Sequence, residues 1–287
     1  MSGLCVEDYF DQPTFTYTFL VYDQATRDAV VIDSLLDYNY PASKIVHSSA
    51  DALVERVNLL GLKVHYLLET HAHADHLTGA HYLKSRLPQA RAAIGEHIAE
   101  VQKVFAGLFN INIATDGSQF DRLLQDGETL ECGSVRVKIL HTPGHTPTCC
   151  SFLINDRAVF TGDTIFMPDY GAARCDFPGG DAATLYRSIT QKLFTLPDET
   201  ENYVGHDYPV DGRRQACKTT IGEQKRGNIM LNADTSEEEF IVARNERDAT
   251  LEAPNLLLPS IQVNIRAGAF PEPEDNGVSY LKIPVRT

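Results

Sequence analysis

The chain has 287 residues, of which 43% are hydrophobic and 22% are charged. This composition is typical of a globular protein with a sizeable core, and it excludes collagen-like, coiled-coil and disordered chains. The 25 basic and 39 acidic residues give a formal net charge of −14, which disfavours general binding to nucleic acid. A small anionic substrate is compatible with this charge, because a few well-placed arginines or lysines suffice to hold a carboxylate.

Two further features of the composition concern the location of the protein. No apolar run approaches the ~20 residues of a membrane-spanning helix, and the first ten residues carry acidic but no basic side chains. We therefore expect no membrane association and no signal peptide. The six cysteines show no CxxC spacing, so we interpret them as reduced thiols of a cytoplasmic protein.

The order of predicted elements indicates the fold class. Residues 14–22 and 29–32 are rich in Thr, Tyr, Phe, Val and Ile and predict an antiparallel hairpin. Apolar residues at helical spacing predict helices over residues 49–60, 96–109 and 182–193. Short apolar runs predict strands over residues 63–68, 135–140, 150–154 and 158–160. This alternation predicts an α/β layered fold, and the hairpins mean that its sheets are not purely parallel.

The pattern changes after about residue 210. Helices are expected over residues 216–231 and 236–249, whereas residues 254–287 are punctuated by Pro and Gly without a clear period. We interpret residues 1–287 as a single domain, with a core of about 1–210 and an appended segment of about 211–287.

Three of the ten histidines fall within one HxHxDH string formed by His71, His73, Asp75 and His76. A strand or a helix could not direct all four groups at one point, whereas a loop that turns back on itself can. This loop follows the predicted strand 63–68, and ligands of α/β sheets gather beyond the carboxyl ends of strands. The string therefore predicts a metal site rather than a polar surface loop.

Three more candidate ligands, His145, Asp163 and His206, also come just after predicted strands. Each follows a glycine, which lets the backbone turn sharply or approach another segment closely. The seven groups suffice for two metals bridged by one carboxylate, or for one metal with supporting residues. Imidazole and carboxylate ligands admit zinc, iron or manganese, and the lack of cysteine favours a catalytic over a structural site. The other histidines show no such pattern and are interpreted as structural or surface residues: His47, His65, His81, His97 and His141.

The succession of HxHxDH, GH, GD and GH resembles the signature of the metallo-β-lactamase superfamily. This resemblance implies an αβ/βα sandwich with a C-terminal helical and irregular extension. The fuller strings are similar to those of the persulfide dioxygenases, a family also called sulfur dioxygenases: THAHADHLTG (70–79), HTPGHT (141–146), TGDT (161–164) and GHDY (205–208). The strings QVNIRAG (262–268) and NGVSYLKIPV (276–285) resemble the tail of a bacterial branch of that family. The resemblance implies an enzyme that oxidises glutathione persulfide with O₂ to sulfite and glutathione in sulfide detoxification.

The same resemblance implies a ligand set for one Fe(II) per chain. By position, the iron and the catalysis would depend on His71, His145 and Asp163, a facial triad that leaves one face open for substrate and O₂. Four groups would then support the site from outside: His73, Asp75, His76 and His206. The residues alone leave open a second reading, in which two Zn(II) ions serve a glutathione thioester hydrolase similar to glyoxalase II. A metal-free binding protein of this fold would not need seven metal-type side chains.

The substrate contacts also follow from the resemblance. The family string GRTDF is replaced here by GAARCDF, in which Arg174 still aligns with the family's arginine. Arg174 is the first candidate for a glutathione carboxylate and Arg266 the second, because guanidinium binds carboxylates bidentately. A surface salt bridge is the alternative for each arginine. Tyr208 is a further substrate candidate, unless its phenol bonds a backbone carbonyl. The sequence leaves the oligomeric state open, with a homodimer as one option.

Overall fold

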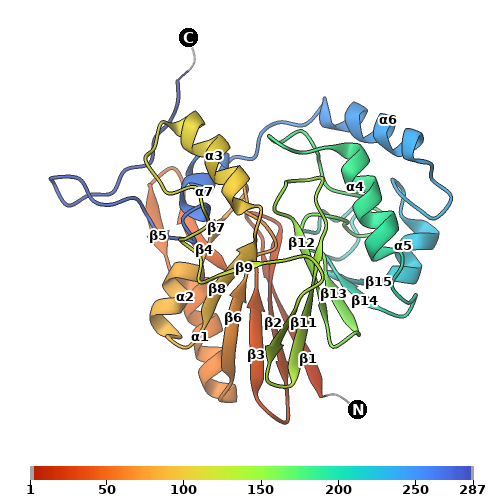
Figure 1. Ribbon diagram of the computed structural model, residues 1–287, viewed down its shortest axis with the longest axis horizontal. Helices are drawn as coiled ribbons and strands as arrows, with labels where there is room; N and C mark the ends of the chain where they lie inside the picture. The colour runs from red at the N-terminus through yellow and green to blue at the C-terminus, as the bar shows by residue number, and fades with distance from the viewer. Residues whose placement is uncertain (1–2, 286–287) are drawn as a thin grey trace.

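The computed structural model describes residues 3–285 and begins with a six-stranded sheet (Figure 1). The order of its strands is β1-β2-β3-β6-β8-β9. Their bounds are β1 Leu4–Asp11, β2 Thr16–Asp23, β3 Asp28–Ile32, β6 Lys63–Leu68, β8 Arg91–Gly95 and β9 Arg122–Leu124. The first three strands pair antiparallel, whereas β3, β6, β8 and β9 run parallel and so end at the same edge of the sheet.

A second six-stranded sheet follows in the order β10-β11-β12-β13-β14-β15. Its strands are β10 Thr129–Cys132, β11 Val135–His141, β12 Cys150–Ile154, β13 Ala158–Phe160, β14 Glu201–Tyr203 and β15 Lys218–Thr220. All neighbours pair antiparallel except β13 and β14, which are parallel. A small third sheet contains β5 Lys44–Val46, β4 Leu35–Asn39 and β7 Leu77–Thr78.

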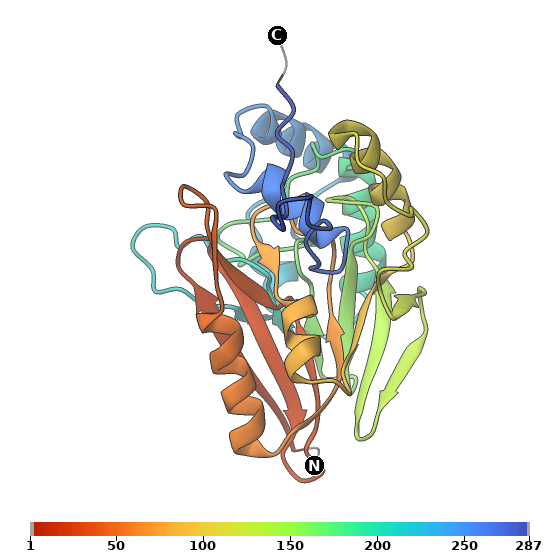
Figure 2. The same cartoon turned by 90° about the vertical axis from the view of Figure 1, so that its left-hand side faces the viewer.

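Helices cover the outer face of each large sheet, which gives four layers in the order αββα (Figures 1 and 2). The first sheet is covered by α1 Ser48–Leu60, α2 Ala80–Arg86, α3 Ile98–Phe109 and α7 Leu257–Asn264. The second is covered by α4 Ala182–Ser188, its π-helical continuation η1 Ile189–Leu193, α5 Ile221–Gly227 and α6 Glu237–Asp248. None of these helices is long and apolar enough to cross a membrane.

The two sheets hold together through the apolar side chains on their facing sides. Phe19 and Ile32 of the first sheet belong to one buried cluster with Phe152 and Phe160 of the second. The rings of Phe19 and Phe160 meet edge to face, with centroids 5.1 Å apart. Each such side chain contributes roughly 1.5 to 3 kcal/mol through burial, so the sandwich is a rigid base for the loops at its edges.

The predicted helix over residues 216–231 is wrong in its first part. Lys218–Thr220 form β15, which pairs with β14 and extends the second sheet past residue 210. Helix α5 begins only at Ile221, because Thr220 caps it and forms a reciprocal capping box with Glu223. An N-cap residue has extended backbone, so it also suits the end of a strand.

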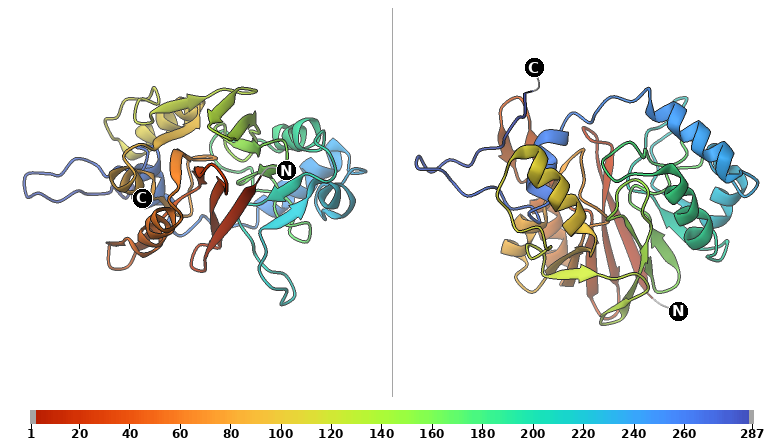
Figure 3. Two further views of the ribbon diagram at one scale, coloured as in Figure 1. Left: turned by 90° about the horizontal axis from the view of Figure 1, so that it is seen from below. Right: turned by 45° about the horizontal axis from the view of Figure 1, so that its top comes forward.

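The tail over residues 254–287 contains a helix that periodicity did not reveal. Helix α7 is buried on nearly all sides, so its apolar residues form no single stripe. Pro259 lies in its first turn, where a missing N–H breaks no helical hydrogen bond. Figure 3 shows α7 beside α3 and α6 beside α4, so the C-terminal segment spreads over both halves of the molecule.

Candidate metal centre

Three of the predicted ligands meet where the strands of both sheets end. The potential ligand atoms of His71, His145 and Asp163 all lie within 4.8 Å of one another. Oδ2 of Asp163 is 3.9 Å from Nε2 of His71 and 3.7 Å from Nε2 of His145. The three side chains are buried. The loops after β6, β11 and β13 therefore bring two imidazoles and one carboxylate to a single point.

Hydrogen bonds on the far side of each ring fix its orientation. The Nδ1 of His145 donates to the carbonyl of Arg174 at 2.7 Å. The Nδ1 of His71 lies 3.0 Å from Oγ1 of Thr70, whose own proton goes to Asp33 at 2.8 Å. Both rings thus carry their proton on Nδ1 and turn the bare Nε2 toward Asp163. Metal-binding histidines are oriented in this way.

Glycines allow the loops to come this close. Gly162, just before Asp163, has a φ of +47°, and a Cβ on it would lie 2.4 Å from Oγ1 of Thr70. A Cβ on Gly205 would lie 3.0 Å from Oδ1 of Asp163. Any larger residue at these two positions would push the loops apart.

The atoms at this point fit a metal ion. Nε2 of His71 and Oδ1 of Asp163 are buried and have no hydrogen-bond partner within residues 3–285. Leaving such a group unpaired costs about 1 to 3 kcal/mol, and an ion would satisfy both atoms. Burial lowers the pKa of His71 well below its ordinary value and also lowers that of His145, against the opposing effect of Asp163. Both rings are therefore neutral, the form that binds metals.

A second group of candidates lies on the other side of Asp163. Nε2 of His206 is 3.4 Å from Oδ1 of Asp163 and 3.4 Å from Oδ2 of Asp75. Its Nδ1 donates to the carbonyl of Phe15 at 3.1 Å. The Nδ1 of His76 is 3.0 Å from Oδ2 of Asp75. Burial alone would lower the pKa of His206, but Asp163 and Asp75 outweigh it and raise this pKa. This side of the site thus favours a positive charge.

His73, the second member of the HxHxDH string, lies against other groups than His71 does. Its Nε2 lies 3.1 Å from Oδ1 of Asp33 and 3.4 Å from Oε2 of Glu69. Burial would lower the pKa of His73, but these two carboxylates raise it well above the ordinary value. Sequence analysis missed both acids. The same pattern that revealed the candidate ligands, a metal-type side chain directly after a strand, could have revealed them. Asp33 follows β3 and Glu69 follows β6.

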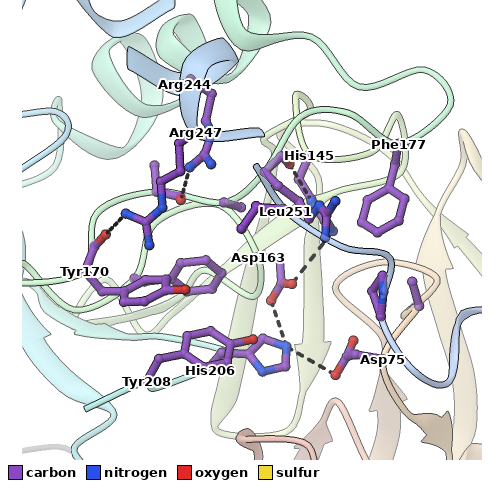
Figure 4. Close-up of a pocket in the computed structure, with 16 residues that line it drawn as sticks. Asp75, His145, Asp163, Tyr170, Phe177, His206, Tyr208, Arg244, Arg247 and Leu251 are labelled. Carbon is purple, nitrogen blue, oxygen red and sulfur yellow. Dashed lines mark hydrogen bonds and ion pairs between the residues drawn. The ribbon is translucent and has the colours of Figure 1, made fainter. Parts of the chain in front are cut away.

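A cavity of about 260 Å³ opens beside these side chains (Figure 4). Its wall combines the metal-type residues with aromatic rings and with arginines from two segments. The aromatic residues are Phe166, Tyr170, Phe177 and Tyr208, and the arginines are Arg174, Arg244 and Arg247. The cavity thus offers apolar surface and positive charge next to the candidate metal centre.

Arg174 reaches the cavity, but its guanidinium is already engaged. Its Nε and Nη2 each lie 2.6 Å from the carboxylate of Asp176, and Nη1 donates to the carbonyl of Glu252 at 2.8 Å. The guanidinium also lies over the ring of Phe177, 5.0 Å from its centroid. The geometry therefore favours the salt bridge, which sequence analysis gave as the alternative for this residue.

Helix α6 supplies the other two arginines of the cavity. Arg244 is fully buried and lies 2.7 Å from Oδ1 of Asp248. Arg247 donates to the carbonyl of Tyr170 at 3.2 Å and lies over its ring, 4.5 Å from the centroid. Among the described residues, Arg247 forms no ion pair with a carboxylate. Sequence analysis missed this cation because no motif marks helix α6.

The remaining two substrate candidates differ in position. Tyr208 lines the cavity, with its ring stacked on His206 at a centroid distance of 5.6 Å, and burial raises its pKa. Arg266 follows α7, and its side chain is not among those that line the cavity in the described part of the chain. Gln102 of α3 donates to the carbonyl of Ile265 at 2.9 Å, which fixes the end of α7 against α3. The structure therefore does not bring Arg266 to the candidate substrate site.

The fold and the site now identify the family. Residues 11–206 match the family model of the Metallo-beta-lactamase superfamily, and the chain belongs to this superfamily. The predicted αβ/βα sandwich is thereby confirmed. A probable metallo-hydrolase of Burkholderia pseudomallei is 49% identical over 98% of this chain and 99% of its own length. Glyoxylase B2 of Dictyostelium discoideum is 47% identical over 98% of this chain and 96% of its own length.

A second kind of relative is more distant but also spans nearly the whole chain. The mitochondrial persulfide dioxygenase ETHE1 of Mus musculus is 32% identical over 95% of this chain and 92% of its own length. The crystal structure of ETHE1 from Myxococcus xanthus superposes with a TM-score of 0.73 at 34% identity. It covers 92% of this chain and 100% of the Myxococcus chain.

Proposed function

We propose that the protein is a non-haem iron persulfide dioxygenase. In this reaction glutathione persulfide, O₂ and water give glutathione and sulfite, so the outer sulfur is oxidised and O₂ is reduced. The relation to persulfide dioxygenase ETHE1 over almost the full chain supports this activity. The geometry adds an independent argument, which concerns the number of protein ligands.

The observation that carries the proposal is the orientation of His73. If its ring joined His71, His145 and Asp163, the site would have four protein ligands, the closed tetrahedral set that zinc accepts. Because Nε2 of His73 instead lies near Asp33 and Glu69, His73 is not among the three residues whose ligand atoms gather at Asp163. Two histidines and one carboxylate form the facial triad that iron oxygenases use, with positions left for substrate and O₂.

The residues around the triad have roles that follow from their contacts. His71, His145 and Asp163 would hold Fe(II), which supplies the redox chemistry with O₂ when it is bound. Phe177 and Tyr208 line the cavity and exclude water from the reacting sulfur. Arg247, the cavity arginine without a carboxylate partner in the described chain, binds a glutathione carboxylate by charged hydrogen bonds. It replaces Arg174 as our first candidate for this contact.

A second candidate function is supported by the other side of Asp163. Asp75 and His206 lie close to Asp163, and with His76 they could hold a second ion bridged by its carboxylate. Two Zn(II) ions in such a site hydrolyse esters by activating water. The names of the relatives that are 49% and 47% identical agree with a hydrolase. Under this alternative hypothesis the protein is a glutathione thioester hydrolase.

Oxygen uptake distinguishes the two functions. We expect the purified protein to consume O₂ and release sulfite when glutathione persulfide is added, and to lose this activity without O₂. The variant His145→Ala serves as the control for uncatalysed oxidation. Rapid hydrolysis of S-lactoylglutathione together with no oxygen uptake from the persulfide would show that the hydrolase reading is right.

A further inference from the structure

His73 is enclosed by two carboxylates that lie outside the HxHxDH string. The side chains of His73, Asp33 and Glu69 are 2 to 3% exposed. Asp33 follows β3 and Glu69 follows β6, and these strands are parallel neighbours. We call Asp33 and Glu69 the carboxylate pair. Neither residue is among those that line the open cavity in the described part of the chain.

Hydrogen bonds hold the carboxylate pair in place. Asp33 accepts from the backbone N–H of Thr70 at 2.7 Å and from its hydroxyl at 2.8 Å. Glu69 accepts from the hydroxyl of Thr78 at 2.6 Å through Oε1, and its Oε2 lies 3.4 Å from Nε2 of His73. Both acids are therefore oriented independently of the histidine.

The backbone of His73 is fixed as well. Asn264 of α7 donates its side-chain N–H groups to the carbonyls of His73 and His76, each at 2.8 Å. Its Oδ1 accepts from the backbone N–H of Thr78 at 2.9 Å. To reach Asp163, the imidazole of His73 would have to give up the carboxylate pair while its backbone stays where it is.

We propose that Asp33 and Glu69 are positioning residues that withhold His73 from the metal and keep the protein ligands at three. The inference rests on the proposed function for the identity of those three, His71, His145 and Asp163. An incomplete tetrahedron favours ions that accept five or six ligands, with the remaining positions open to substrate and water. The carboxylate pair thereby selects against a closed zinc site.

Cobalt(II) tests this coordination directly, because its visible absorption is weak in five- or six-coordinate sites and strong in tetrahedral ones. The metal-free protein is loaded with Co(II) alone. We expect weak bands for the wild type. The variant Asp33→Asn/Glu69→Gln removes both charges with little change of shape, so His73 becomes free to bind. Its bands should be several times stronger, because His73 adds a fourth protein ligand and closes the site to a tetrahedron.

A matched control assigns the effect to His73. The same two substitutions in a His73→Ala background should show weak bands, as in the wild type. Glu69→Gln alone keeps the bonds between Asp33 and Thr70 and should give an intermediate spectrum, so it decides the question if the double variant does not fold. An unchanged spectrum in the folded variants, or strong bands that persist without His73, would overturn the inference.

The Co(II) spectra test the positioning role and the activity assays test the proposed function, so each hypothesis can be refuted without the other. If the wild-type protein hydrolyses thioesters and does not oxidise persulfide while the spectra behave as expected, the positioning role stands and the proposed function is wrong. If the persulfide is oxidised but the spectra do not respond, only the positioning role is wrong.

Discussion

The two ends of the sandwich use aspartate in opposite ways. At the end where the β2–β3 and β10–β11 turns meet, Asp28 is paired on both oxygens, with His65 at 2.7 Å and the backbone N–H of Ser134 at 3.0 Å. At the other end, Oδ1 of Asp163 has no hydrogen-bond partner among residues 3–285. At one end the aspartate is hydrogen-bonded within the protein, whereas at the other an aspartate oxygen is left available to a ligand.

This difference separates stability from function. A half-buried carboxylate that has both its partners, such as Asp28, helps to join the two sheets, because its bonds outweigh the cost of partial burial. The unpaired group at the opposite end is costly, and the rigid sheets hold it in place. Substitutions at the paired end should therefore change unfolding, and those at the open end should change metal binding and catalysis.

The largest effect is expected from removal of a triad ligand. Asp163→Ala takes away the only carboxylate of the triad, so we expect loss of bound metal together with a fall in activity of more than about 100-fold. Metal analysis and oxygen uptake on the same sample measure both. His71→Ala and His145→Ala should behave alike, and the exposed Asp234→Ala is the matched control. Full metal content in Asp163→Ala would remove this residue from the site.

The second-largest effect is expected from removal of Arg247, the cavity arginine proposed to bind the substrate carboxylate. Arg247→Ala should lower kcat/KM for glutathione persulfide by about 10 to 150-fold, the equivalent of ~1.5 to 3 kcal/mol for a charged hydrogen bond. Arg174→Ala should cost less, because Asp176 already pairs with that guanidinium. Metal content should stay at the wild-type level in both variants. A larger loss for Arg174→Ala would return the carboxylate contact to Arg174.

His73→Ala sharpens the distinction within the histidine string. Because this ring contacts Asp33 and Glu69 rather than Asp163, the variant should keep its metal and lose activity by roughly 10 to 100-fold, the usual range for residues that support a metal site. Steady-state rates and metal content are the two measurements. Loss of the metal to the same degree as in Asp163→Ala would make His73 a ligand.

The sequence predicted those parts of the site that are marked by local patterns of residue type and position. The motif residues were found because each is a metal-type side chain just after a strand, and the strands 63–68, 150–154 and 158–160 agree with β6, β12 and β13. The sequence could not place Arg247, since its position depends on how α6 packs over the second sheet. Nor could spacing alone distinguish the direction of His73 from that of His71. His73 lies against Glu69 and against Asp33, which is forty residues away in the chain.

The smallest expected effect is a loss of stability on substitution of Asp28, at the end of the sandwich where the aspartate has its partners. Burial raises the pKa of Asp28, but its bonds to His65 and Ser134 outweigh this and lower it to about 2. A lowered pKa stabilises the fold above the unfolded value of 3.8, so this contribution is lost as the pH falls from about 4 to about 2. Asp28→Asn should cost about 1 to 2 kcal/mol at neutral pH, allowing for solvent screening.

Urea unfolding of wild type and Asp28→Asn at several pH values measures this cost. The difference between the two proteins should be constant well above pH 4, fall between about pH 4 and about pH 2, and vanish at still lower pH. A difference that is independent of pH would mean that the charge of Asp28 is not what joins the turns.

The proposed function depends on one open, three-ligand iron site at the end of the sandwich that carries Asp163. Its most direct test is the metal content of the protein purified without added metal, measured per chain for iron and zinc together. We predict about one iron per chain and little zinc, because His71, His145 and Asp163 form the facial triad. Two zinc ions per chain and no iron would contradict the proposed function and establish the dinuclear site of a hydrolase.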